Sequence, residues 1–269
     1  MSLSDQEQAV LRELQRIVSA PGVDYQYDQL DGTFNGRLLN ADLARELSRD
    51  YRNKYDRLCF TRCSYAPCAQ YVLNRFRNVI RQPCSPGTRA VLFLAGGAAS
   101  GKTSSVGQKT IKLYDLIFDS NLADFQKARM MIDESLKAGW LVDISYIHRP
   151  YDLAVRSMIE RAIDTGRYVP MGKPSKMGKL HVSAQRTIVR LRREFSDDYV
   201  GIDAFENLWT PANPVDAAYI SLSELDKNGQ YHYKDVEELH AIEAEIIASF
   251  RESQFNEDAA FQALNEVEE

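Results

Sequence analysis

The sequence has no apolar stretch that approaches the roughly 20 residues needed to cross a membrane. Its first residues, MSLSDQEQAVLREL, are polar with a helical pattern, so they lack the apolar segment of a secretory signal. Basic residues are not in excess, and the net charge of −5 argues against a broad nucleic-acid-binding surface. We therefore expect a soluble, cytoplasmic protein with no membrane partner and no general affinity for nucleic acid.

Cysteine is scarce, and its spacing is not that of a structural zinc site. Cys59, Cys63, Cys68 and Cys84 follow the pattern C-x3-C-x4-C-x15-C, whereas zinc sites usually combine two closely spaced pairs. We expect reduced, partly buried thiols, as is usual in an intracellular chain.

The remaining composition is that of an ordinary globular protein, with 44% apolar and 26% charged residues. A chain of 269 residues suffices for one large or two small domains. A sharp break at residues 83–87 (PCSPG) is the expected boundary. It separates a mainly helical N-terminal extension (1–85) from a core (86–232), which a C-terminal helical segment (233–269) follows.

The N-terminal extension shows several helix signals. A capping box at residues 4–7 predicts a first helix. Residues 23–39 predict a loop. Asn40 is expected to cap a short helix that reaches Tyr51, and a further helix is expected over residues 69–81.

In the core, apolar runs typical of buried strands alternate with helical patterns. This alternation predicts an α/β fold, with a parallel sheet covered by helices on both faces. Asn121 is expected to cap the second core helix. The side chains expected to point inward from that helix are Phe125, Met130, Ile132 and Leu136. The expected strands are 90–95, 116–119, 140–147, 199–205 and 217–222, and the expected helices are 102–113, 121–138 and 152–165.

One motif points directly to chemistry. Residues 96–103 (GGAASGKT) match G-x-x-x-x-G-K-[ST], the P-loop, and they lie between an apolar strand and a helix. Such a loop cradles phosphates with its N–H groups, so we expect ATP and Mg²⁺ as cofactors. Lys102 would reach the β- and γ-phosphates and Thr103 would ligate Mg²⁺. The alternative is a Gly/Ala-rich turn after a buried strand. The candidate nucleotide-binding residues are Gly96, Gly97, Ala98, Ala99, Ser100, Gly101, Lys102, Thr103 and Ser104.

An acidic residue ends the next strand. Asp119 follows the apolar run 116–118, and the carboxyl end of a parallel strand faces the ligand crevice. Asp119 is therefore a candidate Mg²⁺ partner or catalytic base. The alternative is an Asp that stabilises a helix N-terminus. Asp143 is a weaker competitor, because it lies inside a strand.

Basic residues follow in a segment whose composition resembles a lid. Arg161 and Arg167 are candidates to stabilise the charge that develops on a transferring phosphoryl group. Lys173, Lys176 and Lys179 lie on the Gly/Pro-rich stretch after them, although a solvated basic loop would look the same. His181 begins a helix with Gln185, Arg186, Arg190, Arg192 and Arg193, which is either an exposed basic helix or part of an acceptor pocket.

The segment from Ala90 to about Asn207 resembles the zeta-toxin family of P-loop kinases. The resemblance rests on LFLAGGAASGKTSS, IFDSN, VDISYIHRPYDLAVRSMIERAIDTGRYVP, HVSAQRTIVRL and GIDAFEN. Upstream, GRLLNADLARELSRDYR is similar to a lead-in found in one bacterial and phage-borne branch.

The resemblance implies a P-loop kinase-like fold and ATP/Mg²⁺-dependent phosphorylation of a hydroxyl on a small molecule. Founding members act on a UDP-activated amino sugar, and an antitoxin is a partner such proteins have. The two lid arginines map onto Arg161 and Arg167. The family usually carries a catalytic Asp just beyond its second strand and then an acidic strand end. Here only one strand separates the P-loop helix from the helix near Leu122, so Asp119 is left to cover one or both roles.

Two other functions fit the same motifs. A polynucleotide 5′-kinase would use the basic segments to bind an acidic strand. A nucleotide-dependent interaction module would bind ATP to organise the N-terminal region against a partner, with little turnover.

Overall fold

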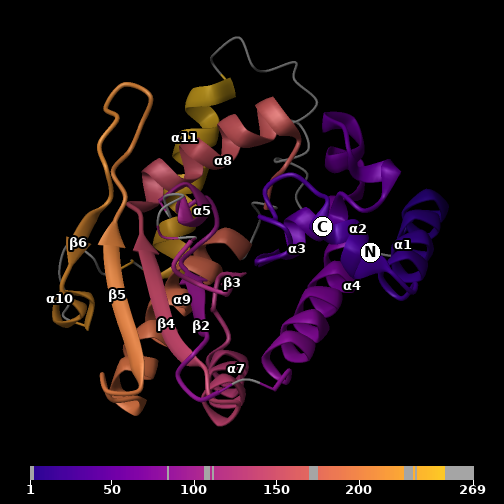
Figure 1. The fold of residues 1–269 in the computed structure, drawn as a ribbon. Coiled ribbons are helices and arrows are strands. Elements are labelled where there is room, and N and C mark those ends of the chain that lie inside the picture. The colour runs from indigo at the N-terminus through magenta and orange to yellow at the C-terminus, as the bar shows by residue number, and fades with distance from the viewer. Residues whose placement is uncertain are drawn as a thin grey trace.

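The structure, a computed structural model, describes residues 3–83, 85–105, 110, 112–169, 175–226, 233 and 235–251 (Figure 1). In this part of the chain no helix is long and apolar enough to cross a membrane. The strands are β1 (Leu38–Asn40), β2 (Ala90–Ala95), β3 (Leu116–Asp119), β4 (Leu141–His148), β5 (Val200–Glu206) and β6 (Ala218–Ile220). The helices before β2 are α1 (Asp5–Val18), α2 (Val23–Asp28), α3 (Ala41–Arg45), the 3-10 helix η1 (Arg49–Tyr51) and α4 (Lys54–Ile80). Those after it are α5 (Lys102–Ser105), α7 (Phe125–Lys137), α8 (Tyr151–Thr165), α9 (Lys176–Glu194), α10 (Leu222–Asp226) and α11 (Val236–Arg251).

The six strands form one sheet in the order β1-β3-β2-β4-β5-β6. Five of them run parallel, and β6 pairs with β5 in the antiparallel direction. The predicted α/β class and the predicted strands of the core are confirmed. The strand ends lie within one or two residues of those expected, and the last strand is antiparallel.

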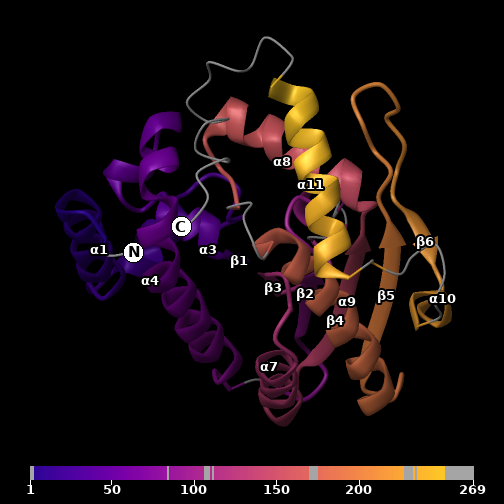
Figure 2. The same cartoon turned by 180° about the vertical axis from the view of Figure 1, so that it is seen from behind.

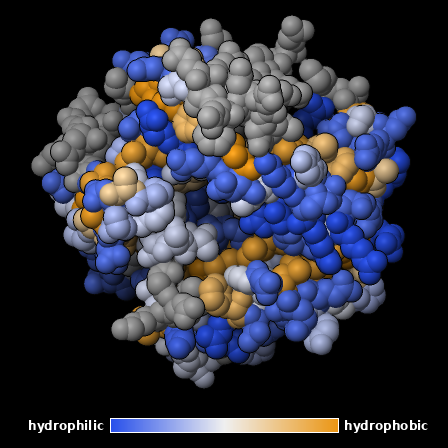
Figure 3. Space-filling view, turned by 90° about the horizontal axis from the view of Figure 1, so that it is seen from above, coloured by the Kyte–Doolittle hydropathy of each residue, from blue (hydrophilic) through white to orange (hydrophobic). Residues whose placement is uncertain are grey.

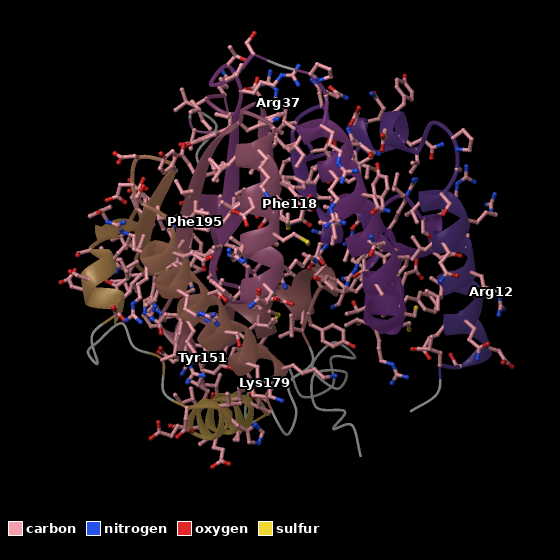
Figure 4. All side chains as sticks on the ribbon, turned by 90° about the horizontal axis from the view of Figure 1, so that it is seen from below. Arg12, Arg37, Phe118, Tyr151, Lys179 and Phe195 are labelled. Atoms are coloured by element: carbon pink, nitrogen blue, oxygen red, sulfur yellow. The ribbon has the colours of Figure 1, made fainter. Side chains whose placement is uncertain are left out.

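One face of the sheet carries most of the core. Phe93 and Phe118 project from neighbouring strands, and Phe76 of α4 packs on both, with ring centroids 5.6 and 5.2 Å away. Figure 4 shows Phe118 near the centre of the molecule. Helices α7 and α9 complete this layer through buried residues such as Met131 and Ile188. Because apolar area is withdrawn from water here, this face supplies most of the burial that holds the sheet.

The opposite face carries a smaller apolar layer, against which Leu43 of α3 packs. Among the described residues its apolar cluster is small, and it combines Leu92, Leu94 and Ile117 with Leu38 of the edge strand. Asp143 lies beside Leu92 in the register, so polar groups share this face. Helix α5, the first part of the helix expected over residues 102–113, contacts β2 and β4. Residues 106–109 and 111 of that expected helix lie outside the described residues, and the chain is already in a turn at Leu113.

The N-terminal region is built into the sheet. The prediction of a loop over residues 23–39 is wrong, because α2 and the first two residues of β1 lie within it. Strand β1 pairs with β3, so that Asn40 lies opposite Asp119. Asn40 also caps α3 as predicted, by accepting from the N–H groups of Asp42 and Leu43. The helix after this cap is shorter than expected and ends at Arg45.

Helix α4 is longer than its sequence signals suggest. It begins at Lys54 rather than near residue 69, and it contains Pro67. Proline removes one helical hydrogen bond and usually interrupts a helix, so the first half could not be recognised locally. Burial of Phe60, Val72 and Phe76 against the N-terminal helices and the sheet keeps it continuous.

Two details of α7 differ from the prediction. Asp124, not Asn121, caps this helix by accepting from the N–H of Lys127. Met131 is buried, whereas Met130 is 40% exposed. The other three residues expected to point inward, Phe125, Ile132 and Leu136, do lie against the core.

The C-terminal helix α11 packs on two helices of the core. Figure 2 shows α11 in front of α8 and α9, and it contacts both. Figure 4 shows Tyr151 and Lys179 toward this helix. The predicted helical segment is thus confirmed for residues 236–251.

The aromatic contact between α4 and the sheet can be tested by truncation. Phe76→Ala should lower the free energy of unfolding by about 3–5 kcal/mol, because it leaves a cavity beside the rings of Phe93 and Phe118. Tyr55→Ala on the same helix should change it by less than about 0.5 kcal/mol, because Tyr55 is 70% exposed. Urea denaturation of both variants measures the difference, and equal effects would contradict the packing.

Candidate functional site

A cavity of about 1110 Å³ opens at the carboxyl ends of the parallel strands. Figure 3 looks onto this end and shows a hollow near the middle of the face, with hydrophobic residues along one side. Ligands bind outside the carboxyl ends of the strands in open α/β sheets. The lining includes residues 99–103 of the glycine-rich loop (residues 96–103), the segments after β1 and β3, α8 and the segment after β5.

A buried histidine supports the glycine-rich loop from beneath. His181 Nε2 lies 2.8 Å from the carbonyl oxygen of Ala98, and a carbonyl can only accept, so Nε2 carries the proton. A Cβ at Gly97 would come within 2.2 Å of the imidazole ring. Only glycine therefore lets the loop lie this close. Burial lowers the pKa of His181 to about 3, so the ring is neutral at physiological pH.

An asparagine at the end of β5 holds the other side of the loop. Asn207 Nδ2 donates to the carbonyl oxygen of Ser100 at 2.8 Å, and Asn207 Oδ1 accepts from the N–H of Trp209. A Cβ at Gly101, whose φ is +83°, would come within 2.2 Å of the same amide nitrogen. The loop is thereby joined to the segment that carries Trp209, which is half-exposed at the cavity.

Lys102 is held inside the curve of the loop. Its ammonium donates to the carbonyl oxygens of Gly96 and Gly97 at 3.2 and 2.9 Å, and to Asn121 Oδ1 at 3.2 Å. Burial lowers its pKa, and the carboxylate of Asp119 opposes that shift. Asn121 was expected to cap a helix, and it instead positions this lysine.

Asp119 and Thr103 meet directly. Thr103 Oγ1 donates to Asp119 Oδ2 at 2.8 Å, and Asn40 Nδ2 donates to the same oxygen at 2.7 Å. Asp119 is buried at the end of β3, and α7 begins six residues later with Asp124 as its cap. Its alternative role at a helix N-terminus is therefore excluded.

Asp42 is an acid of this cavity that the sequence did not single out. It lies in the first turn of α3, lines the cavity and forms an ion pair with Arg45 at 3.2 Å. Its side chain is 40% exposed. Strand β1 brings it beside Asp119, although 77 residues separate them in the chain.

The two candidate arginines, Arg161 and Arg167, have different surroundings. Arg161 of α8 lines the cavity, and burial lowers its pKa while Asp42 opposes the shift. Among the described residues it forms no ion pair, and Arg161 Nε donates to the carbonyl oxygen of Arg167. Arg167 instead forms an ion pair with Glu46, which also binds Arg57. Arg167 thus ties the end of α8 to the N-terminal region.

The other basic residues lie on the outside. Lys176 and Lys179 are exposed, and Lys173 lies outside the described residues. Arg186, Arg190 and Arg193 occupy the exposed face of α9, on the opposite side from His181. That helix is therefore basic on its surface as predicted, but its histidine is buried under the loop.

Two further candidates lie away from the cavity. Asp143 accepts a hydrogen bond from Tyr114 inside β4, and it does not line the cavity. Cys59 is exposed, and burial raises the pKa of Cys63 to about 11 and that of Cys68 to about 12. Cys84 lies outside the described residues.

Comparison with models of known protein families returns no match. No curated protein is significantly similar to the chain.

The buried histidine predicts a pH dependence of stability. The unfolded chain protonates His181 below about pH 6.5, whereas the folded protein does so only near pH 3. The unfolded state therefore holds more protons in this interval, and the free energy of unfolding falls as the pH is lowered through it.

His181→Gln keeps an N–H donor for Ala98 but does not titrate. Its stability should fall less steeply than that of the wild type, by up to about 1.4 kcal/mol per pH unit between about pH 4 and 6.5. Urea denaturation across that range measures the two slopes. Identical slopes would contradict a buried, neutral His181.

Proposed function

We propose that this protein is an ATP- and Mg²⁺-dependent phosphotransferase of the zeta-toxin type, which phosphorylates a hydroxyl of a small molecule. The observation that carries the proposal is the meeting of Lys102, Thr103 and Asp119 at the carboxyl ends of the strands. The glycine-rich loop would then be a P-loop, and the chain a P-loop kinase. The hydrogen bond from this loop to a carboxylate is expected of a phosphate-transfer site, and a purely structural Gly/Ala-rich turn would not need it.

The contacts of the loop suggest the direction of the nucleotide. In a P-loop, the lysine contacts the β- and γ-phosphates and the threonine hydroxyl lies beside the metal. Thr103 bonds to Asp119, the last residue of β3, and Lys102 bonds to Asn121, which follows that strand. The γ-phosphate would therefore lie on the β3 side of β2, and the nucleoside would extend toward the half-exposed Trp209 beyond β4.

The residues around Thr103 fit a magnesium ion. No group of three or more His, Cys, Asp or Glu side chains could hold a metal in the part of the chain that the structure describes. Mg²⁺ needs no such group, because it commonly uses one or two protein oxygens together with substrate phosphates and water. Thr103 Oγ1 and Asp119 would supply these oxygens. When bound, the ion would neutralise charge on the β- and γ-phosphates.

Two acids share the side of the cavity where the acceptor would bind. Asp119 Oδ2 is already occupied by Thr103 and Asn40, which suits a residue that holds the metal environment. Asp42 is more exposed, and its ion pair among the described residues is with Arg45. We therefore assign Asp42 as the base that takes the proton from the acceptor hydroxyl. The resembling family carries its catalytic Asp just beyond the second strand, and here Asp42 follows edge strand β1.

Arg161 would stabilise the transferring group. Its guanidinium lines the cavity and forms no ion pair with a described residue, so it can pair with phosphate oxygens. Arg167, which is bound to Glu46, would support the position of α8 and not contact the nucleotide itself.

The composition of the acceptor side bears on the alternatives. Its walls include Tyr65 and Val72 of α4 and Met131 of α7. Lys127 is the basic residue that α7 contributes to the cavity, and Asp124 lies close to it in the chain. An acidic strand would require more positive charge, so a polynucleotide 5′-kinase has less support than a small-molecule kinase. A nucleotide-dependent interaction module would need the same loop without transfer, and an assay of turnover distinguishes it.

Transfer of labelled phosphate tests the proposed activity. The protein is incubated with γ-labelled ATP, Mg²⁺ and a panel of metabolites that includes nucleotide-activated sugars, and the products are read by mass spectrometry. Lys102→Ala should weaken ATP binding about a hundredfold, because it removes a buried charge that faces the phosphates. Tight ATP binding without a labelled product would favour the interaction module, and unchanged affinity in Lys102→Ala would contradict the site.

Substitution of Asp42 and of Asp119 should have different effects on the kinetics of phosphate transfer. Asp42→Asn should lower kcat by roughly 10²- to 10⁴-fold and leave the KM for ATP nearly unchanged, because it removes the base alone. Asp119→Asn should also shift the Mg²⁺ concentration needed for half-maximal activity. If Asp42→Asn retained full activity while Asp119→Asn lost it, Asp119 would be the base.

A further inference from the structure

A third arginine of the cavity is unlike the other buried arginines. Arg149 follows β4, lines the same cavity as the glycine-rich loop and is 3% exposed. Arg45 and Arg75 are the other arginines buried in the described part of the chain. Arg45 pairs with Asp42, and Arg75 pairs with Asp24 and Asp28. Arg149 forms no ion pair with any described residue.

The hydrogen bonds of Arg149 use only part of its guanidinium. Arg149 Nη2 donates to Ser157 Oγ and to the carbonyl oxygen of Trp209, both at 2.9 Å. Its Nε is buried without a partner, and Nη1 donates to no described residue. Nε is enclosed by the protein, as it is in Arg45 and Arg75, so Nη1 is the nitrogen of this cavity-lining side chain that is left to bind a ligand.

A buried guanidinium with only neutral acceptors is costly, because its charge has left water and has not met an opposite charge. Burial lowers the pKa of Arg149, although arginine stays protonated at any physiological pH. Glu160 and Asp152 oppose this shift from a distance without contacting the side chain. An anion in the cavity would supply the missing charge, and phosphate oxygens match the donors of arginine.

The position of Arg149 indicates which phosphates it would meet. Strand β4 lies on the opposite side of β2 from β3, where Thr103 bonds to Asp119. Arg149 therefore lies away from the γ-phosphate end and toward Trp209, whose carbonyl oxygen it binds. Between the loop and Trp209 the nucleotide would present its α- and β-phosphates.

We propose that Arg149 binds the α- and β-phosphates of the nucleotide, so that affinity for the diphosphate and transfer of the γ-phosphoryl group depend on different arginines. This inference rests on the proposed function for the identity of the anion. Because Arg149 also binds the Trp209 carbonyl, the same side chain joins the phosphates to the segment beside the nucleoside.

Titration calorimetry with ADP, in the absence of any acceptor, tests this assignment. Arg149→Gln should weaken ADP and ATP binding alike, by roughly 10- to 100-fold, because both ligands carry the two phosphates. Arg161→Gln should change ADP affinity by less than about threefold and instead lower kcat, since it acts on the γ-phosphate. Ser157→Ala is the matched control, because it removes a hydrogen-bond partner of Arg149 and keeps the charge. It should leave ADP affinity within about threefold of the wild type.

Several outcomes would overturn the assignment. One is a folded Arg149→Gln variant that binds ADP as tightly as the wild type. Another is a Ser157→Ala variant that loses as much ADP affinity as Arg149→Gln does, because that result would indicate a structural role for Arg149. If Arg149→Gln does not fold, Arg149→Lys replaces it in the experiment. Wild-type affinity for ADP in Arg149→Lys would also contradict the assignment. The wild type could also bind ADP, lose that binding in Lys102→Ala, and transfer no phosphate. This result would refute the proposed kinase activity, and the ADP affinities of the Arg149 variants would still test the role of Arg149.

Discussion

The hydrogen-bonded pairing of β1 with β3 is the contact on which the site depends. It attaches a segment from before the glycine-rich loop to the edge of the sheet and brings Asn40 opposite Asp119. Asn40 then does two things at once, since its amide nitrogen donates to Asp119 and its oxygen caps α3. Asp42 lies in the first turn of that helix. Without this one strand, Asp119 would lose a partner and the cavity would lose an acid.

A second constraint is the excess of positive charge on buried and half-buried side chains around the cavity. Lys102 donates to three neutral oxygens, and Arg149 and Arg161 form no ion pairs with described residues. Buried charges in proteins are usually paired, because the interior solvates them poorly. The N-terminal half of the chain follows that rule at Arg45 and Arg75, and the cavity does not. A site that holds unpaired cations is adapted to a highly anionic ligand, which is consistent with the triphosphate of the proposed function.

Much of the fold could be predicted because its signals are local. The strand before the glycine-rich loop, the strand that ends at Asp119 and helix α8 all follow from short apolar or periodic patterns. The errors have a common cause. Residues 38–40 are too few to show a strand pattern, and the first half of α4 contains Pro67, so their conformations depend on distant partners. The buried position of His181 depends on the close approach permitted by Gly97, a contact between residues 84 positions apart.

For the site, the sequence by itself determined the chemical groups on the loop and at the end of β3, because strand, loop and helix follow one another directly. Only the tertiary structure decided that Asp42, Asn207, Arg149 and His181 converge on them, while Arg167 turns to Glu46. The physical reason is that strand order and helix packing are set by contacts across the whole sheet. No local pattern records which strand will lie beside which, and that order decides which side chains share the cavity.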